Sequence, residues 1–184
     1  MPTNSPRASS REKLLDAAAD LITQHSVQEL TLEGVAQAAG VTKGGLIYHF
    51  KTKDELLGAV VERILSQLDE RYRAKAATRG NTTDALLLAL VDDTFDMPES
   101  ERRLVANLLA AASSYPHLLA PVQGLYGRLY GQFADAGKNA GLALVLAAAL
   151  DGIVLLELMN LHQFQPEQHQ AMRQVLQELA KNLA

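Results

Sequence analysis

The chain has 184 residues, 48% of them hydrophobic, and a formal net charge of −4. This length and composition provide a buried core for one domain or two small ones, whereas the charge argues against a protein that coats nucleic acid indiscriminately. Because the chain contains no cysteine, disulfides, thiolate zinc sites and cysteine nucleophiles are excluded.

The first segment, Met1–Ala8, is polar, holds two prolines and lacks helical periodicity, so we expect a flexible arm. Arg7 and the following Arg11 are candidates for phosphate or minor-groove contacts, although a solvated tail is the favoured interpretation for Arg7. No basic region leads into an apolar segment at this end of the sequence, so we expect a cytoplasmic protein rather than a secreted one.

A helix is predicted over Arg11–Gln24, because Ser9 and Glu12 form a capping-box pattern at its start. Its apolar stripe comprises Leu14, Leu15, Ala18, Leu21 and Ile22. We expect this helix to support two shorter ones that follow it. The small core between the three helices would hold Leu30, Leu32, Val35, Leu46 and Phe50.

The two shorter helices meet at a glycine. Thr31 is placed to cap the first, and Thr42 is placed to cap the second, which runs from Lys43 to about His49. Gly40 between them suits the left-handed conformation that ends a helix and turns the chain sharply. This arrangement is the helix-turn-helix pattern, whose second helix enters the major groove of DNA. The alternative is an ordinary helical hairpin in which the glycines ease a close crossing.

The residues around the second helix fit contact with DNA. Lys43 is the best candidate for reading a base, because lysine can donate to guanine O6 and N7. Gly44 and Gly45 each cost about 0.5–1 kcal/mol of helix propensity relative to alanine, so they need a compensating role such as close approach to DNA. The major-groove candidates are Lys43, Gly44, Gly45, Tyr48 and His49, and the phosphate candidates are Thr31, Thr42, Lys51 and Lys53. Acidic residues balance the basic ones in Met1–Gly58, so we expect marked salt sensitivity.

The stretch GVTKGGLIYHFKTKDELL resembles the signature of the TetR family of bacterial transcriptional regulators. The match extends over roughly Arg11–Leu57 and agrees in residue type at many fixed spacings. The family commonly has tyrosine at the position of Ile47, so a hydroxyl that often meets DNA is missing here. Ile47 can still contact a thymine methyl group.

A longer helix is predicted over Thr52–Lys75, again with a capping box at its start, formed by Thr52 and Glu55. It is too long to belong only to a three-helix domain, so we interpret it as the link to the rest of the molecule. The expected organisation is a DNA-binding domain over residues 1–50, a connecting helix over 51–75, and an effector-binding and dimerisation domain over 76–184.

The remaining sequence predicts only helices, and the fold class is therefore all-α. These helices span Asp84–Phe95, Glu99–Ser114, Leu118–Ala136, Leu142–Phe164 and a final helix that opens at Pro166. Pro121 either opens or kinks the third of them. Leu142–Phe164 is apolar enough for a membrane-spanning helix to be considered. However, Asp151 and Glu157 within it favour a buried helix of a soluble core or dimer interface.

No enzymatic signature is present, and we expect neither catalytic residues nor a cofactor. The five histidines, His25, His49, His117, His162 and His169, show no metal-ligand spacing, so no metal site is predicted.

The resemblance implies a homodimer formed through the last two helices, with two recognition helices that read a palindromic operator. The interface candidates are Gly152, Leu155, Met159, Met172, Val175, Leu176 and Leu179. It also implies a pocket for a small effector of unknown identity, with candidates Phe95, Met97, Asn107, Tyr115, Tyr126, Tyr130, Phe133 and Asp151. Bundle core is the alternative for each of these. Asp151 stands out because an ionised carboxylate in an apolar setting needs a partner.

The function expected from these features is that of a transcriptional repressor released from DNA by the effector. A corepressor-dependent regulator, an activator, and a helical small-molecule binder without a regulatory role are the alternatives that the sequence leaves open.

Overall fold

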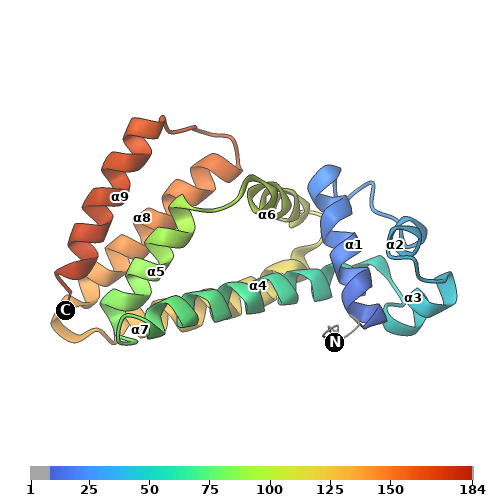
Figure 1. Cartoon of the computed structure of the whole chain (residues 1–184), viewed down its shortest axis with the longest axis horizontal. Helices are drawn as coiled ribbons and strands as arrows, with labels where there is room; N and C mark the ends of the chain where they lie inside the picture. The colour runs from blue at the N-terminus through green and yellow to red at the C-terminus, as the bar shows by residue number, and fades with distance from the viewer. Residues whose placement is uncertain (1–8, 184) are drawn as a thin grey trace, which may run out of the picture. The chain divides into compact units, whose positions relative to one another are not determined.

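The computed structural model describes residues 9–183, and in this range helices alternate with turns and no strand occurs (Figure 1). The all-α prediction is therefore confirmed. The predicted arm Met1–Ala8, with Arg7, lies outside the described residues. The chain divides into two compact units, one of residues 1–63 with 103–118 and one of residues 64–102 with 119–184.

The first unit contains α1 (Ser10–Gln24), α2 (Leu32–Ala38) and α3 (Lys43–His49), which pack on one another. Their starts are capped as predicted. Ser9 accepts a hydrogen bond from the backbone N–H of Glu12, Thr31 from that of Gly34, and Thr42 from that of Gly45. The core between them includes Leu14, Leu15, Ile22, Leu30, Val35, Leu46 and Phe50, all buried.

The turn between α2 and α3 depends on Gly40, whose φ of +64° lies in the left-handed region. The N–H of Val41 donates to the carbonyl of Ala36, which closes the end of α2. A side chain at position 40 would strain the backbone even though the space beside it is open. The predicted helix-turn-helix is therefore confirmed down to the conformation of its glycine.

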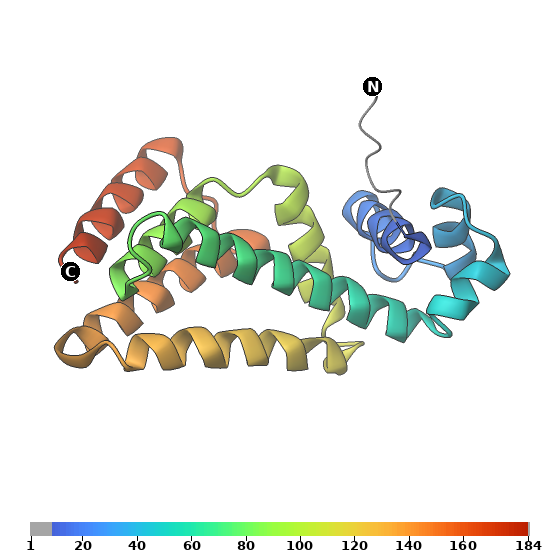
Figure 2. The same cartoon turned by 60° about the horizontal axis from the view of Figure 1, so that its bottom comes forward.

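Two helices contribute residues to both units. One of them, α4 (Lys53–Ala77), is uninterrupted over its whole length and can be followed in Figure 2. The other, α6 (Glu99–Ala111), belongs to the first unit from Arg103 onward. It ends three residues earlier than the predicted Ser114, because turns at Ala112 and Ser114 already fold the chain back onto Leu109 and Ala111.

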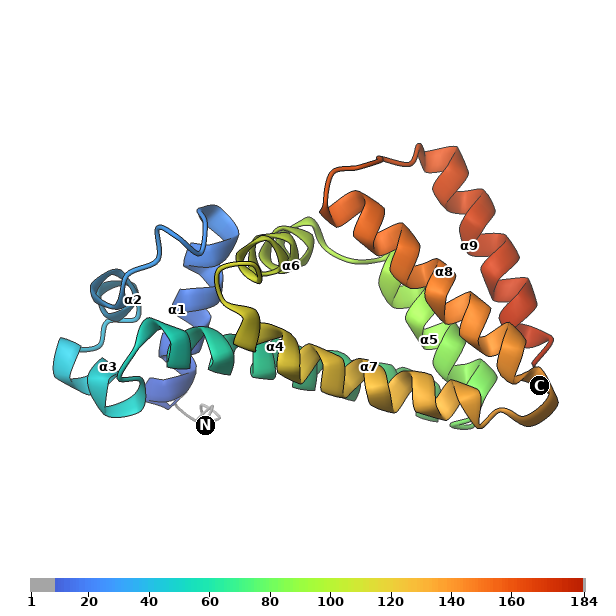
Figure 3. The same ribbon diagram turned by 180° about the vertical axis from the view of Figure 1, so that it is seen from behind.

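The second unit is built around α5 (Thr83–Phe95), which packs against α8 (Ala140–Leu158) and α9 (Pro166–Lys181) (Figure 3). The helix α7 (Leu119–Ala134) packs against α8, and short 3₁₀ turns precede both helices, η1 at Pro116–Leu118 and η2 at Gly137–Asn139. A continuous apolar core joins these elements, with Leu87, Val91, Leu125, Phe133, Leu146, Leu150 and Leu176 among its members. Pro121 lies in the first turn of α7, so it opens the helix rather than kinking it.

The prediction that one helix continues to Phe164 is wrong. The helix α8 ends at Leu158, because Asn160 adopts a left-handed φ of +53° and the N–H groups of Leu161 and His162 turn back to the carbonyl of Leu156. Asparagine tolerates this conformation better than most residues. The apolar residues Leu161 and Phe164 make the sequence resemble a continuing helix, although the backbone turns at Asn160.

Candidate functional site

The third helix exposes large side chains that nothing in its own unit covers. Leu46 and Phe50 are buried against α1 and α2, whereas Ile47 is 43% exposed and Tyr48 is 85% exposed. His49 lies between these sets, with its ring 5.1 Å from that of Tyr48 and 6.4 Å from that of Phe50. A short helix that buries one face and presents an exposed tyrosine on the other is available to an external partner.

The paired glycines of α3 have different reasons for being glycine. A Cβ atom on Gly45 would lie 2.9 Å from Cγ1 of Val41 and 3.2 Å from Oγ1 of Thr42, so these side chains must shift before a side chain fits there. A Cβ atom on Gly44 would meet nothing within 4 Å. Of these two glycines, Gly44 is therefore the one whose missing side chain is not explained by packing within the protein.

Lys43, the predicted base reader, is held by an acidic residue that belongs to no recognisable sequence motif. Its Nζ lies 2.6 Å from Oε1 of Glu33 on α2, and both side chains are about two-thirds exposed, at 66% and 64%. The hydrogen bond from Lys43 holds the pKa of Glu33 below its usual value, so this carboxylate is ionised and can only accept. No sequence spacing predicts the pair, because the turn at Gly40 separates its members.

The phosphate candidates lie at or just before the starts of helices: Thr31 caps α2, Thr42 caps α3, and Lys51 and Lys53 lie at the start of α4. The hydroxyls of Thr31 and Thr42 accept the capping N–H groups of their helices and retain their own O–H to donate. Lys51 is exposed. Lys53 donates from Nζ to the carbonyl of Gln28 at 3.1 Å, which ties the start of α4 to the loop before α2. Arg11, also considered for phosphate contact, lies with its guanidinium 5.5 Å from the centre of the Phe50 ring.

A second cluster lies in the other unit, where Asp151 of α8 meets two tyrosines of α7. Tyr130 donates from its hydroxyl to Oδ2 of Asp151 at 2.6 Å, and Tyr126 donates to Oδ1 at 3.1 Å. The two tyrosine rings stack with centroids 6.0 Å apart, and Phe133 lies beyond them. Burial and the negative charge of Asp151 raise the pKa of both tyrosines, which keeps the hydroxyls protonated as donors.

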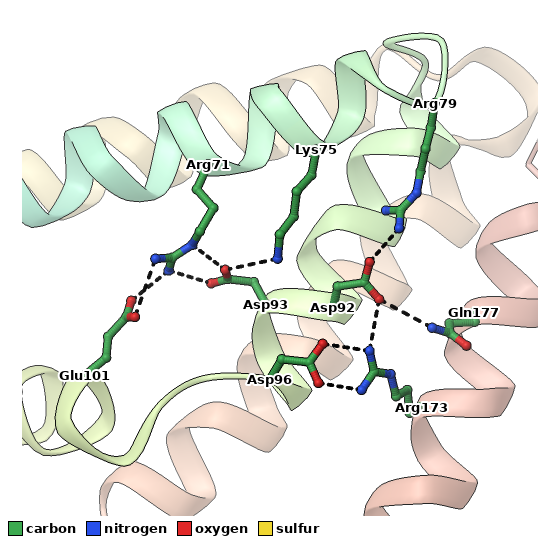
Figure 4. A network of polar contacts seen from close by, with 9 residues as sticks. All are labelled: Arg71, Lys75, Arg79, Asp92, Asp93, Asp96, Glu101, Arg173 and Gln177. Atoms are coloured by element: carbon green, nitrogen blue, oxygen red, sulfur yellow. Dashed lines mark hydrogen bonds and ion pairs between the residues drawn. The ribbon is translucent and has the colours of Figure 1, made fainter.

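Asp151 differs from the acidic residues of its unit that pair with cationic side chains. In Figure 4, Arg71 joins Asp93 and Glu101, Arg79 pairs with Asp92, and Arg173 pairs with Asp92 and Asp96. Glu157 is paired with Arg102 and His169. Within the part of the chain that the structure describes, no cationic side chain pairs with Asp151, which has only the two hydroxyls.

The structure separates the other effector candidates. Phe95 and Met97 belong to the second unit and are partly buried, with the Phe95 ring 5.5 Å from that of His169. Asn107 and Tyr115 belong to the first unit. The amide of Asn107 donates to the carbonyls of Ile22 and His25, at 2.6 and 2.9 Å, so it anchors α6 to the end of α1.

The interface candidates divide into exposed and buried groups. Leu155, Met159 and Val175 are exposed, Gly152, Met172 and Leu179 are partly buried, and Leu176 belongs to the core. Val145, at 65% exposure, and Leu156, at 37%, extend the exposed apolar surface of α8 beyond the predicted residues. Residues Gly137–Leu158 also meet the length and composition of a membrane span. Core helices of soluble proteins meet the same criteria, and both acidic side chains of α8 are engaged with other helices.

Two hollows among the described residues are lined by residues other than Asp151. A hollow of about 260 Å³ lies in the first unit and is lined by Leu21, His25, Glu29, Leu30, Thr31 and Gly34. Another, in the second unit beside Leu86 and Leu129, measures about 10 Å³, about the space for one water. Among residues 9–183, no group of three or more His, Asp or Glu side chains is arranged to hold a metal ion.

Both parts of the chain are similar to known families. Residues 14–60 match the family described as "Bacterial regulatory proteins, tetR family", and residues 84–181 match "Tetracyclin repressor-like, C-terminal domain". The HTH-type transcriptional regulator BetI of Stenotrophomonas maltophilia is 31% identical over 168 residues, which cover 84% of each chain. The HTH-type transcriptional repressor KstR2 of Rhodococcus jostii is 30% identical over 102 residues, covering 55% of this chain and 50% of that one.

The fold is similar to that of solved structures. The multidrug binding protein EbrR, complexed with imidazole, aligns with a TM-score of 0.69 at 25% identity over 93% of this chain and 94% of that one. The similarity therefore extends over both units and includes the helices that carry the exposed face of α3 and the Asp151 cluster.

Proposed function

The chain belongs to the TetR family of DNA-binding transcriptional regulators, and we propose that it represses transcription from a palindromic operator until a small effector binds. The observation that carries this proposal is the exposed face of α3, with Tyr48 uncovered, Gly44 open and Lys43 at its first turn. The major groove of DNA is wide and deep enough to admit a seven-residue helix that is exposed in this way.

On DNA, α3 would lie in the major groove with Lys43, Gly44, Ile47 and Tyr48 toward the base pairs. The hydroxyls of Thr31 and Thr42 and the ammonium of Lys51 would donate to phosphates on either side. His49, the last residue of α3, would lie at the groove as well. We propose residues 1–50 as the DNA-binding domain, 51–75 as the connecting helix and 76–184 as the effector-binding and dimerisation domain.

The dimer would form through α8 and α9. The exposed apolar residues Val145, Leu155 and Leu156 recur at helical spacing along α8, Met159 follows at its end, and Val175 adds to them from α9. A second copy would bury this surface, because association removes apolar side chains from water. A two-fold dimer presents two α3 helices to half-sites about 34–36 Å apart, hence the palindrome.

The effector would bind at the Asp151 cluster. A carboxylate with two tyrosine hydroxyls and no cation suits a ligand that brings a positive charge or hydroxyl groups, with the stacked rings as its apolar wall. Tyr126 is 40% exposed, so this cluster is open to solvent on one side. The effector would release DNA by preferring a conformation with the wrong spacing of the two DNA-binding domains, and only to the extent of that preference.

We assign the protein a cytoplasmic location and no catalytic activity. Regulators of this family act on DNA, which supports both assignments.

Selection of DNA from a random-sequence pool by the purified protein tests the proposal, at an ionic strength of about 0.15 M. We expect a palindromic consensus with two half-sites about one helical turn apart. A folded, dimeric protein that enriches no sequence, with or without pools of small molecules, would overturn the assignment. A consensus that emerges only with small molecules present would identify a corepressor-dependent regulator instead.

A further inference from the structure

The ion pair between Lys43 and Glu33 places an acid where the proposed function expects only cations. Lys43 begins α3 and Glu33 lies in the first turn of α2, so both belong to the helix-turn-helix. Their charged atoms are 2.6 Å apart, and neither side chain is buried. Exposed ion pairs of this kind contribute little to stability, and a carboxylate repels phosphates. Stability and phosphate binding therefore leave the acid unexplained.

The two side chains together present one donor group beside one acceptor group. A lysine ammonium only donates hydrogen bonds, and an ionised carboxylate only accepts them. In the major groove, a G·C pair exposes the acceptor O6 of guanine beside the donor N4 of cytosine. These two base atoms are hydrogen-bonded to each other and hence about 3 Å apart, close to the 2.6 Å between Nζ and Oε1.

We infer that Lys43 and Glu33 read a single G·C base pair in each half of the operator. Lys43 donates to O6 and N7 of guanine, and Glu33 accepts from N4 of the paired cytosine. The inference rests on the proposed docking of α3 in the major groove, and it names a base pair and a second reading residue for that interface.

The other three base pairs fit this donor and acceptor pair less well. A C·G pair reverses the order, so the ammonium meets the cytosine donor and the carboxylate meets guanine acceptors. An A·T pair sets the carboxylate against thymine O4. A T·A pair keeps the order of acceptor and donor but lacks N7 beside the ammonium and has a methyl group there. We expect the preference G·C, then T·A, with the other two worst.

The ion pair of Lys43 and Glu33 also discriminates against DNA of unrelated sequence. The ammonium of Lys43 is neutralised by Glu33, so it adds little attraction to phosphates. The carboxylate opposes close approach to DNA unless a donor group of a base forms a hydrogen bond with it. Replacing Glu33 by glutamine frees the charge of Lys43. The variant should bind unrelated DNA more tightly, with a salt dependence steeper by roughly one phosphate contact.

The test uses the full-length protein and the operator found by selection, with each position of the half-site changed to all four base pairs. The variants are Glu33→Gln and Lys43→Ala. The control is Glu62→Gln, which removes the same charge from an exposed site on α4 in the same unit. Dissociation constants are measured at several salt concentrations, and thermal unfolding checks that every variant is folded.

In the wild type, changing one G·C pair of each half-site to C·G should weaken binding about tenfold or more. Glu33→Gln should abolish most of this discrimination at that pair and leave other positions unchanged, because glutamine offers both a donor and an acceptor. Lys43→Ala should lose discrimination at the same pair, and the double variant should lose little more. Glu62→Gln should retain the wild-type pattern.

The inference is overturned if Glu33→Gln keeps the wild-type preferences at every position, or if it changes them no more than Glu62→Gln does. In either case the wild-type consensus would still support the proposed function. If the wild type selects no sequence at all, both the proposed function and this inference fail.

Discussion

At the scale of single residues, neighbouring positions of the helix-turn-helix have different physical reasons for their identity. Gly40 adopts a left-handed backbone conformation, and Gly45 leaves room for Val41 and Thr42. At Gly44, no neighbouring atom requires the absence of a side chain. A sequence pattern shows three glycines in a short stretch and does not separate these reasons. The distances around an added Cβ atom do, and they lead to opposite predictions for the paired glycines.

Gly44→Ala should leave the protein folded and weaken operator binding. Alanine gains about 0.5–1 kcal/mol of helix propensity, but its methyl group would stand between α3 and the base edges. Displacing α3 should cost about tenfold or more in affinity, as the loss of one base contact does. Thermal unfolding and operator binding of the variant measure both effects.

Gly45→Ala is the matched comparison and should act through stability. Its Cβ would lie 2.9 Å from Cγ1 of Val41, so the packing of Val41 must shift, at a cost of about 1–3 kcal/mol that outweighs the gain in propensity. A Gly45→Ala protein as stable as the wild type would contradict the packing argument. An unchanged operator affinity in Gly44→Ala would contradict the docking of α3.

Glu157 is a second residue whose role the structure defines. It is 7% exposed and accepts charged hydrogen bonds from Arg102 and His169, at 2.5 and 2.6 Å. Burial acts to raise its pKa, but these two partners prevail and hold the pKa of Glu157 below its usual value. A group with a lowered pKa stabilises the fold above its unfolded pKa, about 4.3 for glutamate, and this stabilisation is lost as the pH falls through the lower, folded value.

Glu157→Gln should therefore destabilise the protein at pH 7 and lose its effect in acid. Breaking a buried ion pair costs about 3–5 kcal/mol, and we expect the lower end because Arg102 and His169 keep some contact with water. Urea unfolding of both proteins at one concentration, over a series of pH values, measures the difference. A difference that stays constant below pH ~4 would show that ionisation of Glu157 is not its source.

At the scale of elements, local chemistry predicted most of the fold. The caps at Ser9, Thr31 and Thr42 and the turn at Gly40 appear where the sequence indicates, because each depends on a few adjacent residues. The end of α8 was missed because Asn160 lies within an apolar run.

The pairing of charges could not be predicted in the same way. Glu33 meets Lys43, and Asp93 meets Arg71, only after the chain has folded, so no sequence spacing marks these partners. The sequence likewise singled out Asp151 but left its partners open, and the structure supplies the two tyrosines.

The exposed face of α8 leads to a prediction about association. Leu155→Asp should convert the dimer to a monomer, because a carboxylate buried in an apolar interface without a partner costs several kcal/mol. Gln123→Asp, on the exposed side of α7, introduces a carboxylate at another helical surface and should remain dimeric. Sedimentation equilibrium distinguishes the two. A Leu155→Asp protein that is still dimeric and folded would place the interface elsewhere.

At the scale of the whole molecule, the proposed repressor works only if one dimer engages two half-sites together. The second contact is then intramolecular and strengthens binding by roughly 10²–10⁴-fold over a single half-site. This gain depends on spacing, because a fixed two-fold axis permits only one separation of the α3 helices. The palindromic operator and the dimer therefore depend on each other. Disrupting either one should reduce the affinity to that for a single half-site.

Inserting about five base pairs at the centre of the operator turns the second half-site to the opposite face of the duplex, since a helical turn holds about 10–10.5 base pairs. Wild-type affinity should fall to that for an isolated half-site. Leu155→Asp, as a monomer, should bind the original and the expanded operator equally, at the same low affinity. If the wild type tolerates the insertion, the two DNA-binding domains are not held at a defined spacing. An effector could not then release DNA by changing that spacing, and it would have to act on each α3 helix separately.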